Sequence, residues 1–210
     1  MSSRERAPER KSSSRGAGKS QNGERGGTAP QVELALTAKP VPGAVSRGDF
    51  LETLARLTTS VWVVTANNAL GRPLGRTVTS MMSVSAAPPT IMVSIMRDAD
   101  LAEAIRATQG FSLSMLASSQ EEVANAFAGK VSPEERFAHA GSWAAWPSGR
   151  PRLLDALAAM DCELSGVVET ETHLLFVGTL IDSAHSETDM PLLWGMRDYR
   201  RLSIDPYADD

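Results

Sequence analysis

Apolar and polar positions alternate with short periods along most of the chain after about residue 50. Val61–Thr65 and Thr90–Ile95 are compact apolar runs, and Phe111–Leu116 alternates apolar residues with serine. Runs of this length that are rich in β-branched and aromatic residues are typical of strands. The same pattern predicts longer strands over 156–168 and 174–181 and short ones over 192–194 and 199–204. Strands therefore dominate the body of the chain.

One predicted extended segment is unusually polar. From Gly75 to Ser85 small hydroxyl residues alternate with Val and Met, and Pro88–Pro89 ends the run. Because proline cannot donate to a strand ladder, the segment predicts two extended pieces that end in a tight turn. Its hydroxyl groups offer many short donors and acceptors. This ribbon is the first candidate for binding a flat polar ligand against backbone.

Helical patterns are few. Asp49 and Glu52 have capping-box spacing before a leucine repeat, Leu101–Ala107 has one apolar side, and Ser119 opens a third helix that runs to about Phe127. Helices do not alternate regularly with the strands. The order predicts a mainly β domain over residues 46–205, an antiparallel, Greek-key-like barrel with flanking helices.

The first 45 residues differ from this body. Residues 1–30 carry seven Lys or Arg and three Glu, so of the 21 basic and 25 acidic residues of the chain, 14 and 22 remain for the rest. We expect residues 1–45 to form a disordered basic tail and linker, because they contain little that could be buried. The remaining net charge of 14 − 22 = −8 argues against nucleic-acid binding.

Other features restrict the chemistry further. Cys162 is the only cysteine, which excludes an intrachain disulfide and fits a cytoplasmic protein. The three histidines are scattered without metal-ligand spacing, so we expect no metal site. No apolar run reaches the roughly 18 residues that a membrane span needs, so we expect no membrane association.

Taken in chain order, these segments resemble the flavin reductase-like family, whose fold is the FMN-binding split barrel. The resemblance extends from Phe50 to Leu202. It is carried by Val61-Trp62-Val63-Val64-Thr65, Gly75-Arg76-Thr77-Val78-Thr79-Ser80, Ser83-Val84-Ser85 with Pro88-Pro89, Leu101-Ala102-Glu103-Ala104-Ile105, Phe111 to Leu116, Glu135-Arg136-Phe137, Cys162-Glu163-Leu164, Thr172 to Gly178, Pro191-Leu192-Leu193-Trp194 and Tyr199-Arg200-Arg201-Leu202.

The resemblance implies an NAD(P)H:flavin oxidoreductase. Such an enzyme reduces FMN or FAD by hydride transfer from NADH or NADPH and supplies reduced flavin to a separate flavin-dependent monooxygenase or halogenase. The small reductase components of two-component flavin monooxygenases belong to this family. The resemblance also implies a homodimer with each flavin site near the subunit boundary.

The resemblance also implies site residues. The flavin would lie along the ribbon, with its phosphate near Arg97 and near the helix that starts at Leu101, because helix N-termini favour anions. His173 would take the catalytic position, orienting the nicotinamide. The implied flavin contacts are Leu74, Gly75, Arg76, Thr77, Val78, Thr79, Ser80, Ser94, Ile95, Met96, Arg97, Leu101 and Phe127, and the nicotinamide side comprises His173, Trp194, Arg197 and Tyr199.

Three positions depart from the family pattern and keep a second interpretation open. Thr79 stands where asparagine is common, Asp100 precedes the implied phosphate helix, and Ala126 replaces an arginine. The alternative is a flavin-binding module, a carrier or sensor, without efficient NAD(P)H turnover. An oxidase acting on a pyridoxamine-phosphate-like substrate is a third interpretation, which lacks a basic cluster for the substrate phosphate. The sequence leaves FMN versus FAD and NADH versus NADPH open.

Overall fold

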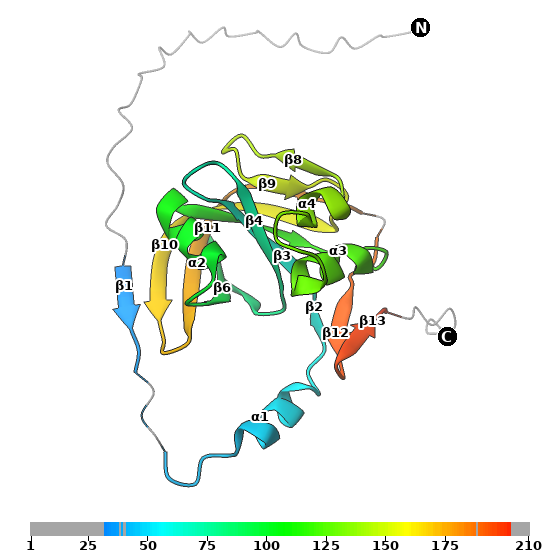
Figure 1. The fold of residues 1–210 in the computed structure, drawn as a ribbon. Coiled ribbons are helices and arrows are strands. Elements are labelled where there is room, and N and C mark those ends of the chain that lie inside the picture. Colours follow the sequence, from blue (N-terminus) through cyan, green and yellow to red (C-terminus); the bar gives the residue numbers. More distant parts are fainter. Residues whose placement is uncertain (1–31, 38, 40, 188, 203–210) are drawn as a thin grey trace, which may run out of the picture.

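The computed structural model describes residues 32–37, 39, 41–187 and 189–202, and Figure 1 shows their arrangement. An eight-stranded sheet forms most of the fold, with seven strands in the order β4-β3-β7-β10-β11-β6-β5 and β1 paired with β10. These strands are β1 (Val32–Ala35), β3 (Trp62–Asn67), β4 (Pro73–Val78), β5 (Met81–Ala86), β6 (Pro89–Met96), β7 (Gly110–Met115), β10 (Ala158–Glu169) and β11 (His173–His185). The predicted mainly β fold with a large antiparallel sheet and few helices is confirmed.

The smaller elements flank this sheet. Two short sheets are formed by β2 (Thr59–Ser60), β12 (Leu193–Gly195) and β13 (Asp198–Arg200), and by β8 (Trp143–Ala145) and β9 (Pro151–Leu153). The helices are α1 (Arg47–Leu54), α2 (Asp100–Thr108), α3 (Glu121–Asn125), the π-helical turn η1 (Ala126–Lys130) and α4 (Arg136–His139). Residues 129–152, for which the sequence analysis predicts neither helix nor strand, therefore contain α4, β8 and most of β9.

The two edges of the main sheet are neighbours in the chain. β4 and β5 stand at opposite ends of the strand order, yet only Thr79 and Ser80 separate them. The sheet must therefore curl until its edges approach each other at these two residues. No ladder joins β4 to β5 within the described ranges, so the curled sheet stays open along this seam. The Ser80 hydroxyl donates to the carbonyl of Ser94 on β6 at 2.8 Å, which fixes the chain where it crosses the seam.

Two apolar clusters fill the two sides of the curled sheet. The larger contains Trp62, Phe111 and Phe176 and is covered by α2 through Leu101 and Ile105. The second includes Phe127, Trp146 and Leu153 and is covered by α3, η1 and the β8–β9 hairpin. Their burial supplies the main stabilisation of the fold, at roughly 25 cal/mol per Å² of apolar surface removed from water.

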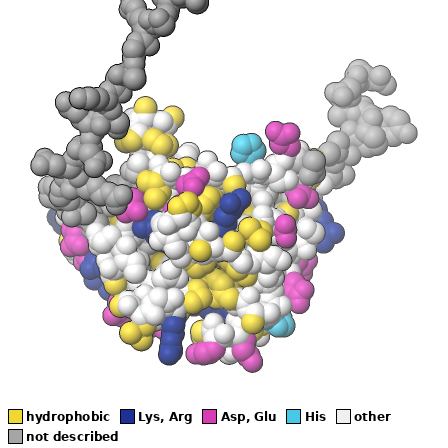
Figure 2. Space-filling model, turned by 90° about the horizontal axis from the view of Figure 1, so that it is seen from above, with side chains coloured by type: hydrophobic (Ala, Val, Ile, Leu, Met, Phe, Trp, Pro, Cys, Tyr) yellow, Lys and Arg dark blue, Asp and Glu magenta, His cyan; other side chains and the backbone are white. Residues whose placement is uncertain are grey.

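Figure 2 views the molecule from above and shows apolar side chains grouped on that face among charged ones.

The N-cap of helix α1 lies three residues before the predicted position. Ser46 is the N-cap, because its hydroxyl accepts from the Asp49 N–H at 3.1 Å and donates to the Asp49 carboxylate at 2.8 Å. The predicted cap at Asp49 is wrong, since Asp49 is the partner of the actual cap. The predicted apolar side also differs from the observation, because α1 has no buried residue and lies apart from the main sheet in Figure 1.

The other two predicted helices are both present, but their observed bounds differ from the predicted ones. Helix α2 extends the predicted 101–107 span by one residue at each end. The third helix begins at Glu121 after Gln120, so the predicted start at Ser119 is wrong. It continues directly into η1, which reaches Lys130, three residues beyond Phe127.

An additional strand lies in the region predicted to be linker. β1 pairs in parallel with Gly166–Glu169 of β10, and the Leu36 N–H donates to the Glu169 carbonyl at 2.7 Å. The prediction of a linker up to residue 45 did not anticipate this strand. The predicted disordered tail over 1–30, and the predicted end of the domain at 203–205, lie outside the described residues.

Membrane-spanning helices and metal-binding clusters are both absent from the described residues. Where the structure is described, no helix is long and apolar enough to cross a membrane. Among the same residues, no three His, Cys, Asp or Glu side chains gather in a way that could hold a metal ion.

Candidate functional site

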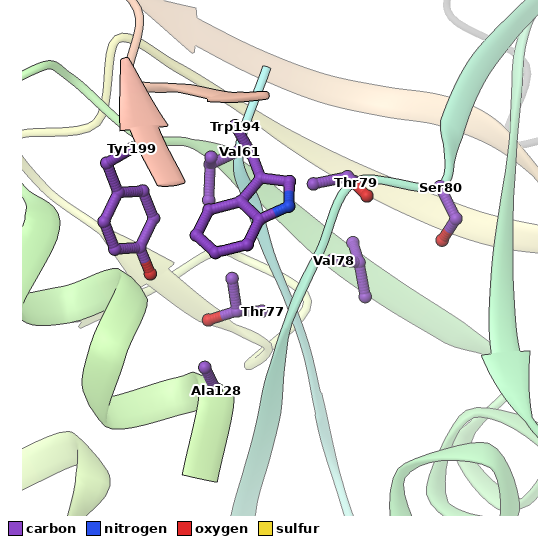
Figure 3. A pocket seen from close by; sticks show the side chains of 8 residues that line it. All are labelled: Val61, Thr77, Val78, Thr79, Ser80, Ala128, Trp194 and Tyr199. Carbon is purple, nitrogen blue, oxygen red and sulfur yellow. The ribbon is translucent and has the colours of Figure 1, made fainter. Parts of the chain in front are cut away.

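A hollow of about 280 Å³ opens where β4 leaves the sheet (Figure 3). We call it the Trp194 hollow. Its walls come from four parts of the chain: Val61 between β2 and β3, the end of β4 with the two residues after it, the turn η1, and the β12–β13 hairpin. It is lined by Val61, Thr77, Val78, Thr79, Ser80, Ala128, Trp194 and Tyr199. Hydroxyl groups and backbone on one side and aromatic rings on the other suit a flat ligand with a polar edge.

The aromatic wall is held in place from two sides. The rings of Trp194 and Tyr199 meet edge to face with centroids 5.0 Å apart, and in Figure 3 the indole lies between Tyr199 and Thr79. The Tyr199 hydroxyl donates to Asn125 Oδ1 of α3 at 3.3 Å. Burial raises the pKa of Tyr199, so the phenol keeps its proton and remains a donor.

The hairpin that carries these rings turns tightly. Met196 and Arg197 both have left-handed backbone conformations, with φ of 56° and 62°. Such a turn matches the twist of a two-residue hairpin but is costly for side chains other than Gly, Asn and Asp. Contacts from α1 support it, because the Met196 N–H donates to the Ala55 carbonyl at 2.8 Å and Arg197 pairs with Glu52 at 2.6 Å. Helix α1 thus helps to position the aromatic wall.

The close packing of β4 beside this hollow depends on a glycine. A Cβ atom built on Gly75 would lie 2.6 Å from Cε1 of Phe127, closer than packed carbon atoms approach. Phe127 is fully buried and forms an aromatic cluster with Phe137 and Trp143, with ring centroids 4.8–5.2 Å apart. β4 can therefore lie flat on this cluster because Gly75 has no side chain.

A second hollow, of about 220 Å³, follows on the same strand. We call it the Arg136 hollow. It is lined by Leu74, Gly75, Arg76, Asp98, Ala99, Asp100, Leu101, Pro133 and Arg136. Arg136 donates to the carbonyls of Gly75, at 3.2 Å, and Val131, at 3.3 Å. Among the described residues neither Arg76 nor Arg136 forms an ion pair, and burial together with the charge of Arg76 lowers the pKa of Arg136.

Helix α2 opens into the Arg136 hollow without a side-chain cap. Its N-cap residue is Ala99, which has no side-chain acceptor for the first N–H groups of the helix. These groups carry partial positive charge. Two guanidinium groups that form no ion pair within the described residues and an uncapped helix start therefore meet at one place, beside the carboxylates of Asp98 and Asp100. This combination can hold an anionic group.

Arg97 lies elsewhere. Its guanidinium pairs with Glu169 at 3.4 Å and donates to the carbonyl of Thr170. Glu169 also pairs with Arg106, and both arginines lower the pKa of Glu169. Arg97 does not line the Arg136 hollow, so the residue expected to hold a phosphate is committed to the β10–β11 turn in this structure.

His173 starts β11 next to Met96 of β6. Its Nδ1 lies 2.8 Å from the Thr172 hydroxyl, and its side chain is half-buried. It does not line either hollow, although Met96 beside it is exposed. The residue with the expected catalytic role thus stands on the β6–β11 side of the seam.

The fold brings most of the predicted site residues to the two hollows, but not all of them. Ile95 and Phe127 are buried, the Ser94 carbonyl accepts from Ser80, and Arg197 lines a separate hollow on the other side of Trp194. Val61, Ala128 and, most importantly, Arg136 line the hollows but were not predicted as site residues. Only the segment Glu135-Arg136-Phe137, quoted without a role, pointed to this arginine.

Comparisons with known proteins identify relatives of this chain. Residues 54–203 match the family described as "Flavin reductase like domain". The chain is 36% identical over 154 residues to "FMN reductase (NADH) RutF" of Agrobacterium fabrum, covering 73% of this chain and 87% of the relative. It is also 36% identical over 153 residues to the reductase component of a FADH(2)-dependent resorcinol hydroxylase of a Rhizobium species, covering 72% and 84%.

Solved structures agree with this relationship. The structure of the NADH:FAD oxidoreductase SgcE6 of Streptomyces globisporus, in complex with NAD and FAD fragments, superposes with a TM-score of 0.70. It shares 27% identity with this chain, and the match covers 78% of this chain and 95% of SgcE6. The likeness therefore extends through the strands and hairpin that build both hollows.

Proposed function

The chain belongs to the flavin reductase-like family, and we propose that it reduces FMN or FAD with NADH and releases the reduced flavin to a separate oxygenase or halogenase. The observation that carries the proposal is the juxtaposition of two hollows on β4. One has hydroxyl groups facing aromatic rings, and the other has two arginines together with Asp98 and Asp100 at the start of α2.

The residues of this chain fit a flavin. The Trp194 hollow offers an apolar wall for a tricyclic ring and, at Thr77–Ser80, short donors and acceptors for its polar edge. Gly75 lets β4 pack closely on Phe127 beneath the hollows. Arg76, Arg136 and the first N–H groups of α2 supply hydrogen-bond donors for a flavin phosphate, and Asp98 and Asp100 lie in the same hollow.

The chemistry of hydride transfer belongs to the flavin and the nicotinamide. The contribution of the chain is to hold two flat rings together and to exclude water. In the Trp194 hollow, water is excluded by the apolar side chains of Val61, Ala128 and Trp194. Positioning two reactants at contact distance can lower the barrier by about 7–11 kcal/mol, which is sufficient without an acid or base in the hydride step.

We assign the nicotinamide to the side of Trp194 and Tyr199. His173 approaches from the β6–β11 side of the seam and orients the carboxamide, as its half-buried position beside exposed Met96 permits. Arg197 stands behind Trp194 and contributes through the hairpin turn that it shares with Met196.

We further propose that the open barrel is the FMN-binding split barrel and that two copies form a homodimer. Helix α1 exposes Phe50, Leu51 and Leu54 by 51%, 41% and 41%, and edge strand β5 exposes Met82 and Val84 by 56% and 50%. Exposed apolar side chains on elements at the edge of the fold are typical of an interface. Light scattering of the purified chain measures its mass directly, and a monomer would contradict this assignment.

We attribute the release of reduced flavin to the seam between β4 and β5, which no ladder closes among the described strands. The partner in this proposal is an oxygenase component that takes up reduced flavin, as the names of the relatives indicate for those proteins. We place the protein in the cytoplasm, where its single buried thiol, Cys162, stays reduced.

A spectrophotometric assay tests the proposed function. Purified protein is mixed with NADH and either FMN or FAD, and the nicotinamide absorbance is followed. We expect consumption that depends on both protein and flavin and continues for many turnovers while oxygen reoxidises the free flavin. A rate equal to that of the flavin-free control, together with tight retention of flavin, would instead identify a carrier or sensor.

A further inference from the structure

The turn that carries His173 is closed by hydrogen bonds at its base. The Thr170 N–H and the Thr170 hydroxyl both donate to the His173 carbonyl, each at 2.9 Å. The His173 N–H donates to the Thr170 hydroxyl oxygen at 3.1 Å. Residues 170–172 lie between the end of β10 and the start of β11, so these bonds close the β10–β11 turn. The position of the His173 ring therefore depends on the elements that hold this turn.

Arg97, directly after β6, contacts three successive parts of the turn. Its backbone N–H donates to the Thr172 carbonyl at 3.0 Å. Its guanidinium donates to the Thr170 carbonyl and pairs with the Glu169 carboxylate at 3.4 Å. One residue thus connects the end of β6 to both sides of the β10–β11 turn.

Glu169, the last residue of β10, joins this turn to two further elements. While one carboxylate oxygen pairs with Arg97, the other pairs with Arg106 of α2. Its backbone carbonyl accepts from the Leu36 N–H, just after β1, at 2.7 Å. Glu33 of β1 lies 3.9 Å from Arg106 as well. Strands β1 and β6 and helix α2 therefore meet at one residue, four positions before His173.

Strand β1 buries little apolar surface of its own. Leu34 and Leu36 are 50% and 51% exposed, so hydrophobic burial contributes little to its docking. It pairs with Gly166–Glu169 on the side of β10 where the β7 ladder has ended at Glu163. It thereby fixes the end of β10 immediately before the turn. Because β1 lies outside residues 54–203, the family match does not imply this contact.

Such a network matters more for orientation than for stability. Ion pairs with exposed members contribute little to folding, and the side chain of Arg97 is 40% exposed. A displacement of about 1 Å caused by a remote substitution can nevertheless cost about a hundredfold in rate when it moves a group that orients a reactant. Neither Glu169 nor β1 lines the Trp194 hollow or the Arg136 hollow, so their route to the site is the turn.

We infer that Glu169 is a positioning residue for His173 and that β1 supports it. Glu169 holds the β10–β11 turn against Arg97, Arg106 and β1, which keeps the imidazole directed at the nicotinamide. The inference rests on the proposed function for the role of His173. It adds that a strand outside the family domain acts on the NADH side of the site.

Steady-state kinetics test the role of Glu169. Glu169→Gln removes the charge and keeps the shape, and we expect it to raise the KM for NADH about threefold while kcat and the KM for flavin stay within about twofold. Glu163→Gln is the control, because it makes the same change at an arginine-paired carboxylate of the same strand and should leave all three constants unchanged. An unchanged KM for NADH in Glu169→Gln would overturn the inference.

A double-mutant cycle shows whether Glu169 acts through the histidine. In the His173→Ala background, Glu169→Gln is expected to add no further increase in the KM for NADH, because the group that it positions is gone. Arg97→Lys keeps a cation beside Glu169 and is expected to retain more of the NADH affinity than Arg97→Ala. A full additional increase on top of His173→Ala would mean that Glu169 acts by another route, and the inference would fail.

One atom of β1 can be removed selectively. Leu36→Pro deletes the N–H that donates to the Glu169 carbonyl, whereas Leu36→Ala retains it, and the exposed side chain leaves the core unchanged in both. Leu36→Pro is expected to raise the KM for NADH about twofold to threefold, and Leu36→Ala is expected to match the wild type. Equal KM values in the two variants would exclude β1 from the positioning of His173.

Proton NMR of the imidazole groups reports the position of His173 without NADH or flavin. The chain has three histidines, so His173→Ala identifies the signal of His173 by its loss. We expect Glu169→Gln and Leu36→Pro to shift this signal and to leave those of His139 and His185 in place. Glu163→Gln should shift none of the three. An unmoved His173 signal in Glu169→Gln would overturn the inference.

This measurement also separates the two proposals. A protein that oxidises NADH with the same KM in every variant and shows no shift of the His173 signal retains the proposed function and loses this inference. A protein whose His173 signal moves as expected, yet which never oxidises NADH, loses the function and retains the positioning network.

Discussion

Gly75 lies directly against the ring of Phe127, and a Cβ atom on Gly75 would approach Cε1 of that ring to 2.6 Å. The contact joins the strand that lines both principal hollows to the aromatic cluster beneath it. Phe127 is fully buried, so the ring has little room to move away. The absence of a side chain at position 75 therefore determines how closely β4 packs on η1.

Gly75→Ala tests this contact. Inserting a methyl group into packed surroundings costs about 1–3 kcal/mol, and we expect that loss in the free energy of unfolding measured by urea titration. Gly48→Ala is the control, because its Cβ would meet Ser46 Oγ at an ordinary 3.5 Å and alanine favours a helix. Equal stability of Gly75→Ala and the wild type would show that the strand is not held against the ring.

Arg136 and Arg97 are two candidates for the flavin phosphate, and binding measurements separate them. Arg136→Ala is expected to raise the Kd for FMN and FAD about tenfold, because a charge-assisted contact is lost, while riboflavin, which lacks a phosphate, stays within about twofold. Arg97→Ala serves as the comparison, since Arg97 is occupied by Glu169 and Thr170. A larger loss of FMN affinity in Arg97→Ala than in Arg136→Ala would return the phosphate to Arg97.

A buried ion pair stabilises the fold away from the site. Arg150 donates to Asp161 at 2.9 Å and to Glu163 at 2.9 Å, and the side chains of Arg150 and Asp161 are 8% and 1% exposed. Gly110 makes room for the guanidinium, since a Cβ there would lie 2.0 Å from it. Asp161 Oδ2 is buried without a hydrogen-bond partner, so the carboxylate depends on Arg150.

Removing one partner of this pair should be costly. Arg150→Met leaves a buried carboxylate without its cation, and we expect a loss of about 3–5 kcal/mol in unfolding free energy. Glu163→Gln, at a side chain 52% exposed, is the matched change on the solvent side and should cost under about 1 kcal/mol. Thermal or urea unfolding measures both. Comparable small losses would mean that the pair contributes little.

Helices and strands were predicted correctly from the sequence where the local pattern and the tertiary structure agree. The long strands β10 and β11 and helix α2 were predicted because their apolar residues face one core. The start of α1 was missed because Ser46 and Asp49 both have capping chemistry, and only the structure shows that they bond each other. The exposure of Leu51 and Leu54 was not predictable either, since an apolar stripe looks the same whether it faces a core or a partner.

The candidate site required long-range information. Thr77 and Trp194 meet because the sheet curls and the C-terminal hairpin folds back, and no local pattern encodes that approach. Their proximity was expected only from the resemblance to a family. Arg136 follows Glu134 and Glu135 and has the pattern of a solvated surface, although its guanidinium reaches the Gly75 carbonyl 61 positions away. In the same way, the ion pair between Arg97 and Glu169 could not be predicted from the sequence.

Cys162 should be protected from reagents in the folded protein. Burial raises its pKa from 9.0 to about 12, so the reactive thiolate is scarce at neutral pH and the thiol is covered. We expect a thiol reagent to label the native chain far more slowly than the urea-unfolded chain, with one label per chain because Cys162 is the only cysteine. Rapid stoichiometric labelling of the native protein would contradict the buried position.

The same shift predicts a pH dependence of stability. The folded state favours the protonated thiol, so this contribution is fully present below the ordinary pKa of 9.0 and is lost as the pH rises from there towards about 12. The unfolding midpoint should fall over that window in the wild type and fall less in Cys162→Ala. Parallel pH profiles of the two proteins would exclude the thiol as the cause.

His173 and His185 are the first and last residues of β11, which makes them a matched pair on one strand. His173 is half-buried at the seam, whereas His185 lies at the far end in an exposed position. If His173 orients the nicotinamide, His173→Ala should raise the KM for NADH about threefold to tenfold and change the KM for flavin less, a loss of about 1 kcal/mol in binding. His185→Ala should leave both constants unchanged. Steady-state kinetics with each substrate varied in turn measures them, and an unchanged KM for NADH in His173→Ala would remove this histidine from the site.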